Sequence, residues 1–320
     1  MTVKITLPHD NSYEIFIDEL NELYFDRKVV IITNPTVSGF HLEYLKTKIN
    51  ARELSVCTIP DGEEYKHMQT IEDMLAHCFT HRLDRKSLLI AFGGGVIGDM
   101  TGFAASIYQR GIDFVQIPTT LLSQVDASVG GKTGINNKFG KNLVGAFHQP
   151  IAVYIDPNFL KTLPKREFGA GVAEIVKMAV TFNKDFFEWL EQNDLTTDEN
   201  IRIAIAKSVQ TKADVVSQDE KELGIRAALN YGHTFGHVIE NETNYDTYLH
   251  GEAVGIGMCM ANALAVKLGL MSKDEELRVK NLLEKYDIPT TYKIKDIEDF
   301  YEHFFLDKKS LDNKIKFILP

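Results

Sequence analysis

The chain has 320 residues, of which 44% are hydrophobic, 25% charged and 10% aromatic, and its formal net charge is −10. Such a composition is typical of a globular chain of about two domains, and it excludes a disordered or fibrous protein. The acidic balance argues against broad binding to nucleic acid or acidic membranes, because those surfaces require a basic field. We therefore expect neither partner, and any anionic ligand must meet a local cluster of basic residues.

The cysteines and the first residues indicate where the protein works. The three cysteines are scattered and form no Cys-x-x-Cys pair, which fits a reducing compartment: Cys57, Cys78 and Cys259. Residues 1–10 lack the basic flank and apolar run of a signal peptide. The longest apolar stretch, 253–270, contains an Asn and a Lys, which favours a buried helix over a membrane span. We expect a cytoplasmic protein.

The first half alternates β-rich runs with helical patterns. An opening hairpin is predicted at 4–7 and 13–17. Strands are predicted at 28–33, 54–59, 87–92, 114–117 and 152–155, with helices at 41–49, 68–82 and 100–108. This alternation predicts an α/β domain whose mostly parallel sheet is covered on both faces.

After residue 157 the pattern becomes helical. Helices are predicted at 166–181, 184–191, 199–214, 232–242, 252–268, 273–286 and 297–304. We therefore predict two domains, an α/β domain at 1–157 and an all-helical domain at 158–320. The join between them, near 154–163, is a natural place for a ligand cleft.

A glycine-rich turn follows the predicted strand at 87–92. It opens a helix, and this context makes the G-x-G-x-x-G pattern informative: Gly93, Gly94, Gly95, Val96, Ile97, Gly98 and Asp99. Absent side chains let a pyrophosphate approach the backbone, and a helix N-terminus attracts its charge. The alternative is a tight turn that needs glycine only for a positive φ. Because the motif follows the third strong strand rather than the first, the pattern favours nucleotide binding on a variant architecture.

A second glycine-rich segment, 130–134, superficially resembles a phosphate loop. The P-loop spacing requires a glycine five residues before Gly131, and that position is Asp126. The sequence therefore disfavours NTP hydrolysis. Lys132 remains a candidate contact for a phosphate or carboxylate.

Two histidines and a carboxylate suggest a divalent-metal site. His233 and His237 are four residues apart and would share one face of a helix, and Glu174 lies among small and apolar residues. Two imidazoles and one carboxylate with an open fourth position are typical of catalytic zinc. Spacing alone favours His233 with His237 as the pair and leaves His250 as a loop histidine. The alternative is that these histidines are merely hydrogen-bonded in a helical core.

Spacing also suggests one helical surface around the histidines. Arg226, Asn230, His233 and His237 are separated by four, three and four residues, so a single helix that began early would align them. The sequence predicts such a surface if that helix starts before Arg226.

Together these motifs resemble the 3-dehydroquinate synthase family of sugar-phosphate cyclases. The resemblance runs almost from end to end and rests on PDGEEYK (60–66), GGGVIGD (93–99), PTTLLSQVDASVGGKT (118–133), GKN (140–142), EIVK (174–177), LNYGHTFGH (229–237), HGE (250–252) and DKK (307–309). It implies a Rossmann-like NAD-binding domain, a helical C-terminal domain and an active site in the cleft between them. It also implies a homodimer in which Arg110 reaches the substrate phosphate of a neighbouring subunit.

The resemblance assigns residues to metal, substrate and cofactor. The implied ligands of zinc or cobalt are Glu174, His233 and His250, which leaves His237 facing the substrate or the ligands. Implied substrate contacts are Asp126, Lys132, Asn142, Lys177, Lys212, Arg226, Asn230 and His237, with Lys308 or Lys309. Implied NAD contacts are Asn34, Glu63, Lys66, the residues 93–99, Thr119, Thr120, Lys132, Lys141, Phe159, Thr162 and Leu163. Family members often carry an acid where this chain has Asn34.

The implied reaction converts 3-deoxy-D-arabino-heptulosonate 7-phosphate to 3-dehydroquinate and phosphate. It proceeds by transient oxidation with NAD, phosphate elimination, re-reduction and aldol closure, so it is a lyase reaction without net redox change. This doubly anionic substrate would account for a basic cluster in an acidic protein. The alternatives are another sugar-phosphate cyclase, such as a deoxy-inosose or valiolone-type synthase, and a metal-dependent glycerol or alcohol dehydrogenase.

Overall fold

The computed structural model describes residues 1–8, 11–243, 246–306 and 315–320. The chain forms two compact units: unit 1 comprises Met1–Leu163 with Lys212–Glu220, and unit 2 comprises Pro164–Thr211 with Lys221–Pro320. The predicted domain boundary after residue 157 stays a prediction. These units divide after Leu163, and the end of helix α6 (Asp198–Gln218) belongs to unit 1.

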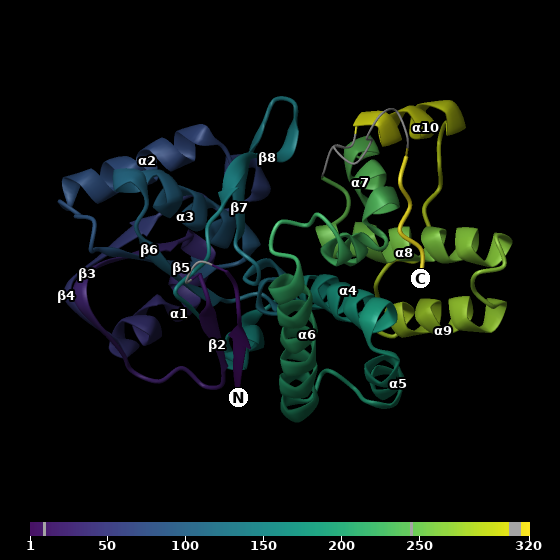
Figure 1. Cartoon of the computed structure of the whole chain (residues 1–320), viewed down its shortest axis with the longest axis horizontal. Helices are drawn as coiled ribbons and strands as arrows, with labels where there is room; N and C mark the ends of the chain where they lie inside the picture. The colour runs from purple at the N-terminus through teal and green to yellow at the C-terminus, as the bar shows by residue number, and fades with distance from the viewer. Residues whose placement is uncertain (9–10, 244–245, 307–314) are drawn as a thin grey trace. The chain divides into compact units, whose positions relative to one another are not determined.

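Unit 1 is built on a seven-stranded sheet with the order β1-β2-β9-β6-β5-β3-β4. Figure 1 labels strands β2 to β6 of this sheet. The strands are β1 (Thr2–Ile5), β2 (Tyr13–Ile17), β3 (Leu23–Thr33), β4 (Ile49–Thr58), β5 (Leu88–Gly93), β6 (Asp113–Pro118) and β9 (Ala152–Ile155). β1 and β2 pair antiparallel, and the other pairings described in this sheet are parallel. The predicted opening hairpin and mostly parallel, Rossmann-like sheet are confirmed.

Both faces of this sheet are covered, because alternate residues of each buried strand point in opposite directions. Val30 and Ile32 of β3 pack in one core with α2 (Met68–Thr80) and α3 (Gly95–Ile107). Val29 and Ile31 pack in a second core with α1 (Pro35–Lys48). The central strands therefore read as continuous apolar runs instead of alternating ones.

The position of the glycine-rich turn follows from the strand order. From β3 the chain passes through α1 to β4 at one edge, whereas from β5 it passes through α3 to β6 on the other side. The carboxyl ends of β3 and β5 are thus neighbours at a topological switch point, where open α/β sheets bind their ligands. The glycines follow the third strong strand because β5, in the middle of the sheet, is where the winding direction changes.

Some predicted elements differ at their ends. α1 begins at Pro35 instead of residue 41, because Asn34 caps it by accepting a hydrogen bond from the Val37 N–H. α3 begins at Gly95 instead of residue 100, so the glycine-rich turn includes its first turn. Short helical turns lie at η1 (Glu63–Tyr65), η2 (Tyr108–Arg110), the π-type η3 (Ser123–Ala127) and η4 (Pro157–Thr162).

A second sheet in unit 1 was not predicted. β7 (Lys132–Asn137) and β8 (Gly140–Phe147) pair antiparallel. Glycine is depleted in strands, so residues 130–134 read as a loop. Here the glycines permit close backbone approach: a Cβ on Gly145 would lie 2.0 Å from the carbonyl oxygen of Thr133. Lys132 is therefore the first residue of a strand.

The regular secondary structure of unit 2 among its described residues consists of helices, as predicted. Its helices are α4 (Lys165–Phe182), α5 (Lys184–Gln192), the first part of α6, η5 (Ile225–Asn230), α7 (His233–Glu242), α8 (His250–Lys267), α9 (Lys273–Glu284) and α10 (Ile297–Leu306). α8 contains most of the long apolar stretch and is largely buried. In the parts of the chain that the structure describes, none of the helices has the length and apolar character needed to cross a membrane.

The buried thiols of unit 1 are expected to be unreactive. Burial raises the pKa of the Cys57 thiol to about 11 and that of Cys78 to about 12. The thiolate is the nucleophile, so the native protein should react with a disulfide reagent near pH 8 much more slowly at these two residues than the unfolded chain does. Unfolded thiols ionise above about pH 8.5, whereas the buried native thiols stay protonated there. The free energy of unfolding should therefore fall as the pH rises above that value. Rapid labelling of both cysteines in the native protein would contradict this prediction.

Candidate active site

The glycine-rich turn lies between the end of β5 and the first turn of α3. A Cβ on Gly93 would lie 2.6 Å from Ile97 Cγ1, and one on Gly98 would lie 2.7 Å from Gln116 Oε1. None of the four glycines is among the described residues with a positive φ, so the tight-turn explanation is wrong. Their lack of a side chain instead lets the turn pack closely against neighbouring side chains. Gly94 caps α3 without a side chain, which leaves N–H groups of the first turn for a ligand.

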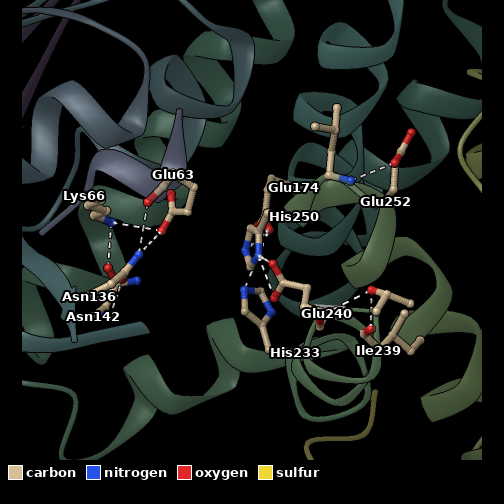
Figure 2. A network of polar contacts seen from close by, with 12 residues as sticks. Glu63, Lys66, Asn136, Asn142, Glu174, His233, Ile239, Glu240, His250 and Glu252 are labelled. Atoms are coloured by element: carbon tan, nitrogen blue, oxygen red, sulfur yellow. Dashed lines mark hydrogen bonds and ion pairs between the residues drawn. The ribbon is translucent and has the colours of Figure 1, made fainter. Parts of the chain in front are cut away.

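A buried lysine organises the polar groups beside this turn. Lys66 is 4% exposed, and its Nζ donates to Asp99 Oδ2 at 2.5 Å and to Asn142 Oδ1 at 2.6 Å. Burial alone would lower the pKa of Lys66, but the carboxylates of Asp99 and Glu63 raise it above its ordinary value. Asn136 Nδ2 donates to Glu63 Oε1 at 2.8 Å (Figure 2). Glu63, Lys66 and Asp99, predicted from the resemblance, are thus brought together with Asn142.

Asn34 lies at the switch point with a carboxylate beside it. Its Nδ2 donates to Asp61 Oδ1 at 2.8 Å, and Thr36 donates to the other oxygen of Asp61 at 2.8 Å. Family members often carry an acid at the position of Asn34. In this chain, Asp61 supplies a carboxylate beside that position. Asp61 lies in the 60–66 motif, but the sequence assigned it no role.

The remaining predicted cofactor residues fall into different surroundings. Thr119 Oγ1 is buried and has no hydrogen-bond partner in the part of the chain that the structure describes, whereas Thr120 Oγ1 lies 2.8 Å from Ser123 Oγ. Thr162 Oγ1 lies 2.7 Å from His41 Nε2, and Phe159 is 2% exposed in the core with α1. Ile97 is also a core residue, while Val96, Lys141 and Leu163 are not part of the buried core: they lie in α3, in β8 and after η4.

Asp126 and Lys212, both predicted substrate contacts, meet in unit 1. Lys212 is 6% exposed, and its Nζ lies 2.8 Å from Asp126 Oδ1 and donates to the Asp126 carbonyl oxygen at 2.6 Å. Lys132 at the start of β7 and Arg110 at the end of η2 are exposed.

In unit 2 three potential metal ligands converge from three helices. Glu174 lies within α4, whereas His233 and His250 are the first residues of α7 and α8. The Nε2 atoms of His233 and His250 each lie 3.7 Å from Glu174 Oε1. Figure 2 draws the three side chains together. Glu174 is fully buried, and among the described residues neither of its carboxylate oxygens has a hydrogen-bond partner, although Lys177 Nζ forms an ion pair with Oε2. A buried carboxylate without donors is costly unless a cation compensates it.

This geometry fits a divalent cation. In a tetrahedral zinc site, bonds of about 2.0–2.2 Å place two ligand atoms ~3.4 Å apart, close to the spacing observed. His233 Nδ1 lies 3.2 Å from the Tyr231 carbonyl oxygen, which favours a lone pair on Nε2. Spacing had favoured His233 with His237. Instead, His233 groups with Glu174 and His250, whereas His237 groups with Glu240 and His250.

The predicted helical surface around these histidines is wrong. Arg226 and Asn230 lie in η5, and α7 begins only at His233, because Gly232 has a φ of +79° that interrupts the helix. Asn230 Nδ2 instead donates to Glu222 Oε1 at 2.5 Å, and Arg226 is 2% exposed. Glu222 lies in a loop, where no periodicity points to it.

Glycines and one ion pair hold the helices that carry these three residues close together. A Cβ on Gly251 would lie 2.0 Å from the Ala170 carbonyl oxygen of α4, and one on Gly257 would lie 2.1 Å from the Gly232 carbonyl oxygen. Arg166 of α4 makes two hydrogen bonds to Glu252 in the first turn of α8, at 2.7 Å and 2.6 Å. Together these contacts place the start of α8, and with it His250, against α4.

The last two predicted residues, Lys308 and Lys309, lie outside the described residues. Lys177, by contrast, is 1% exposed beside Glu174.

The sequence is similar to known proteins along its whole length. Residues 56–170 match the family described as 3-dehydroquinate synthase N-terminal, and residues 171–310 match the one described as 3-dehydroquinate synthase C-terminal. The chain is 68% identical over 322 residues to 3-dehydroquinate synthase of Sulfurovum sp. (strain NBC37-1), covering 100% of this chain and 92% of that protein.

Solved structures of related cyclases share the fold. One is 2-epi-5-epi-valiolone synthase from Streptomyces hygroscopicus subsp. jinggangensis 5008 with NAD⁺ and Zn²⁺ bound: the TM-score is 0.86 at 26% identity, over 99% of this chain and 92% of that one. Another is 2-deoxy-scyllo-inosose synthase with carbaglucose-6-phosphate, NAD⁺ and Co²⁺: the TM-score is 0.84 at 26% identity, over 97% and 88%. Because the family models for both the N-terminal and the C-terminal part match, and the identity to the Sulfurovum protein is 68%, the chain belongs to the 3-dehydroquinate synthase family.

Proposed function

We propose that this chain is a phosphate-eliminating carbon–oxygen lyase that converts 3-deoxy-D-arabino-heptulosonate 7-phosphate to 3-dehydroquinate and depends on NAD and a divalent metal. The observation that carries the proposal is the group of Glu174, His233 and His250 with Lys177 beside it. The high identity to 3-dehydroquinate synthase of Sulfurovum supports the substrate, and the NAD⁺ and Zn²⁺ of the valiolone synthase support the cofactors.

Unit 2 offers the metal site. Glu174, His233 and His250 would hold zinc or cobalt, because a buried carboxylate and two Nε2 atoms suit either ion. When bound, the metal would polarise a substrate hydroxyl, and NAD would accept and return a hydride. Lys177 Nζ, buried against Glu174, would hold a substrate oxygen close to these ligands.

Unit 1 offers the nucleotide site. The open first turn of α3 suits a pyrophosphate, and the unpartnered Thr119 hydroxyl suits a hydrogen bond to the dinucleotide. Lys66 keeps Asp99 and Asn142 in fixed positions through its two hydrogen bonds. We infer that Asp61, oriented by Asn34, takes part in binding the ribose of NAD.

The basic residues fit a substrate with a phosphate and a carboxylate. Lys132, Lys177, Lys212 and Arg226 supply positive charge in a chain of net charge −10, and three of them are buried. Buried cations require anionic partners, which the substrate would supply in addition to the carboxylates already present. Asn142, Asn230 and His237 would contact its hydroxyls.

We further propose a cytoplasmic homodimer. Arg110 is exposed at the end of η2, where it would be available to the substrate phosphate of a second subunit. Three free cysteines fit a reducing compartment.

One assay tests the reaction. Purified protein with zinc, NAD and the heptulosonate phosphate is expected to release phosphate over many turnovers while NADH does not accumulate. Steady NADH accumulation would identify a dehydrogenase. Turnover of a different sugar phosphate in place of the heptulosonate would identify a cyclase of the inosose or valiolone type.

Replacing Lys212 by Ala is expected to impair substrate use. The charged hydrogen bond that the buried ammonium would give the substrate is worth about 1.5–3 kcal/mol, so kcat/KM should fall about 10- to 100-fold. NAD affinity, measured by fluorescence titration, should change little. A variant with normal substrate kinetics and weakened NAD binding would contradict this assignment, and Lys212→Arg, which keeps the charge, serves as the control.

A further inference from the structure

We propose that Glu240 is a positioning residue for the metal site: it accepts a hydrogen bond from Nδ1 of His250 and so directs Nε2 of that ring toward the metal. This inference rests on the proposed metal site of Glu174, His233 and His250, and it adds a fourth residue that does not itself bind the ion.

The contact is specific to one side of the imidazole ring. His250 Nδ1 lies 3.4 Å from both carboxylate oxygens of Glu240, whereas His250 Nε2 lies 3.7 Å from Glu174 Oε1 (Figure 2). The two ring nitrogens therefore face two different carboxylates. Because a neutral imidazole has one N–H and one lone pair, an Nδ1–H donated to Glu240 leaves the lone pair on Nε2.

Burial makes this contact consequential. Glu240 is 2% exposed in α7, so its carboxylate needs a donor to offset the loss of hydration. The side chain of His250 is 37% exposed, compared with 11% for His233. Packing therefore restrains the His250 ring less than the His233 ring, and a hydrogen bond has more to contribute to its orientation.

The two histidines are held by different acceptors. His233 Nδ1 faces the Tyr231 carbonyl oxygen, which any sequence supplies, whereas His250 at the first position of α8 uses a side chain from α7. A carboxylate acceptor also raises the basicity of the imidazole more than a carbonyl does. Glu240 thereby couples α7 and α8 at the site.

A different role for Glu240 is as a ligand, since its oxygens also group with His237 and His250. The geometry argues against this role for the ion held by Glu174, because Glu240 faces the nitrogen of His250 on the far side of the ring. The two roles predict different behaviour of the conservative variant. Gln keeps an acceptor for Nδ1–H but is a poor metal ligand.

The test measures zinc affinity by competition with a chromophoric chelator in wild type, Glu240→Gln, Glu240→Ala and Glu174→Gln. Glu240→Ala should weaken zinc binding about 10- to 100-fold, and Glu240→Gln should recover part of the loss. Glu242→Gln, which removes a carboxylate two residues further along α7, should leave the affinity unchanged. Cobalt-substituted Glu240→Ala should keep the absorption bands of the wild-type coordination, since no ligand is lost. Thermal unfolding of each metal-free variant checks that the fold is retained.

A second readout requires no metal. In metal-free protein labelled with ¹⁵N-histidine, His250 should show the Nδ1–H tautomer, and Glu240→Ala should shift it toward Nε2–H.

The outcomes separate the inference from the proposed function. Wild-type zinc affinity in Glu240→Ala would overturn the positioning role alone. Equal losses in Glu240→Gln and Glu174→Gln, with altered cobalt bands, would overturn it in favour of a ligand. Failure of the wild-type protein to bind any divalent metal would overturn both this inference and the proposed metal site.

Discussion

Replacing Glu174 by Gln is expected to remove the bound metal and to lower turnover about 10³-fold or more, since metal catalysis supplies several kcal/mol of transition-state stabilisation. The carboxylate is fully buried and meets both imidazole Nε2 atoms at 3.7 Å, so the amide would offer the ion a neutral ligand in place of an anionic one. Metal content measured by atomic emission and phosphate release measured in parallel should fall together.

The same outcome is expected for His233→Ala and His250→Ala. Circular dichroism of all three variants should show a folded protein, because Gln matches the volume of Glu and both histidines lie at helix ends. Stoichiometric metal retention in all three purified variants would contradict the ligand assignment.

Replacing Gly251 by Ala is expected to lower the free energy of unfolding by about 3 kcal/mol or more and to weaken metal binding. The new Cβ would lie 2.0 Å from the Ala170 carbonyl oxygen and 2.6 Å from Ala170 Cα. These are backbone atoms of α4, so relief requires the whole start of α8 to move away from the helix that carries Glu174. Chemical denaturation of the metal-free protein and zinc titration measure the two effects separately.

Gly39→Ala is the matched control. Gly39 lies in α1, and no atom of the described residues comes within 4 Å of a Cβ built on it. Since Ala is favoured over Gly in a helix by up to about 1 kcal/mol, this variant should be as stable as the wild type or more so, with unchanged zinc affinity. Equal stability of Gly251→Ala and Gly39→Ala would show that α4 and α8 do not approach as closely as described.

Local sequence patterns were sufficient to predict whether most elements are helices or strands. Strands that are buried on both faces appear in the sequence as continuous apolar runs. The apolar runs of β3 and β5 and the helical periodicity after Pro164 were recognised, although ends shifted where a cap decides, as Asn34 does for α1. The β7–β8 hairpin was missed because its glycines serve backbone contact between strands, a demand that only the paired strand creates.

At the candidate metal site, sequence spacing pointed to the wrong histidine. His233 and His237 share a helix, but the contact with Glu174 depends on where helices begin: α7 and α8 each start with a histidine directed at α4. The family resemblance identified His250, because the HGE motif at 250–252 is one of the segments on which the resemblance rests. The family motifs assigned no role to Asp61, which lies in the 60–66 motif, and they do not include Glu222 or Glu240, because the contacts of these three residues depend on the fold.

The sequence by itself determined the class of each half, the glycine-rich turn and the family, because these depend on residue types at fixed spacing along one strand or helix. The tertiary structure decided which groups meet. It alone shows that β5 adjoins β3 at the switch point, that Lys66 is buried against Asp99, and that His250 replaces His237 beside Glu174. The physical reason is that binding of a metal or phosphate group depends on the charges around it and on their distances. In this chain, helix packing sets these distances, because it brings Glu174 next to His250, which lies 76 residues later in the sequence.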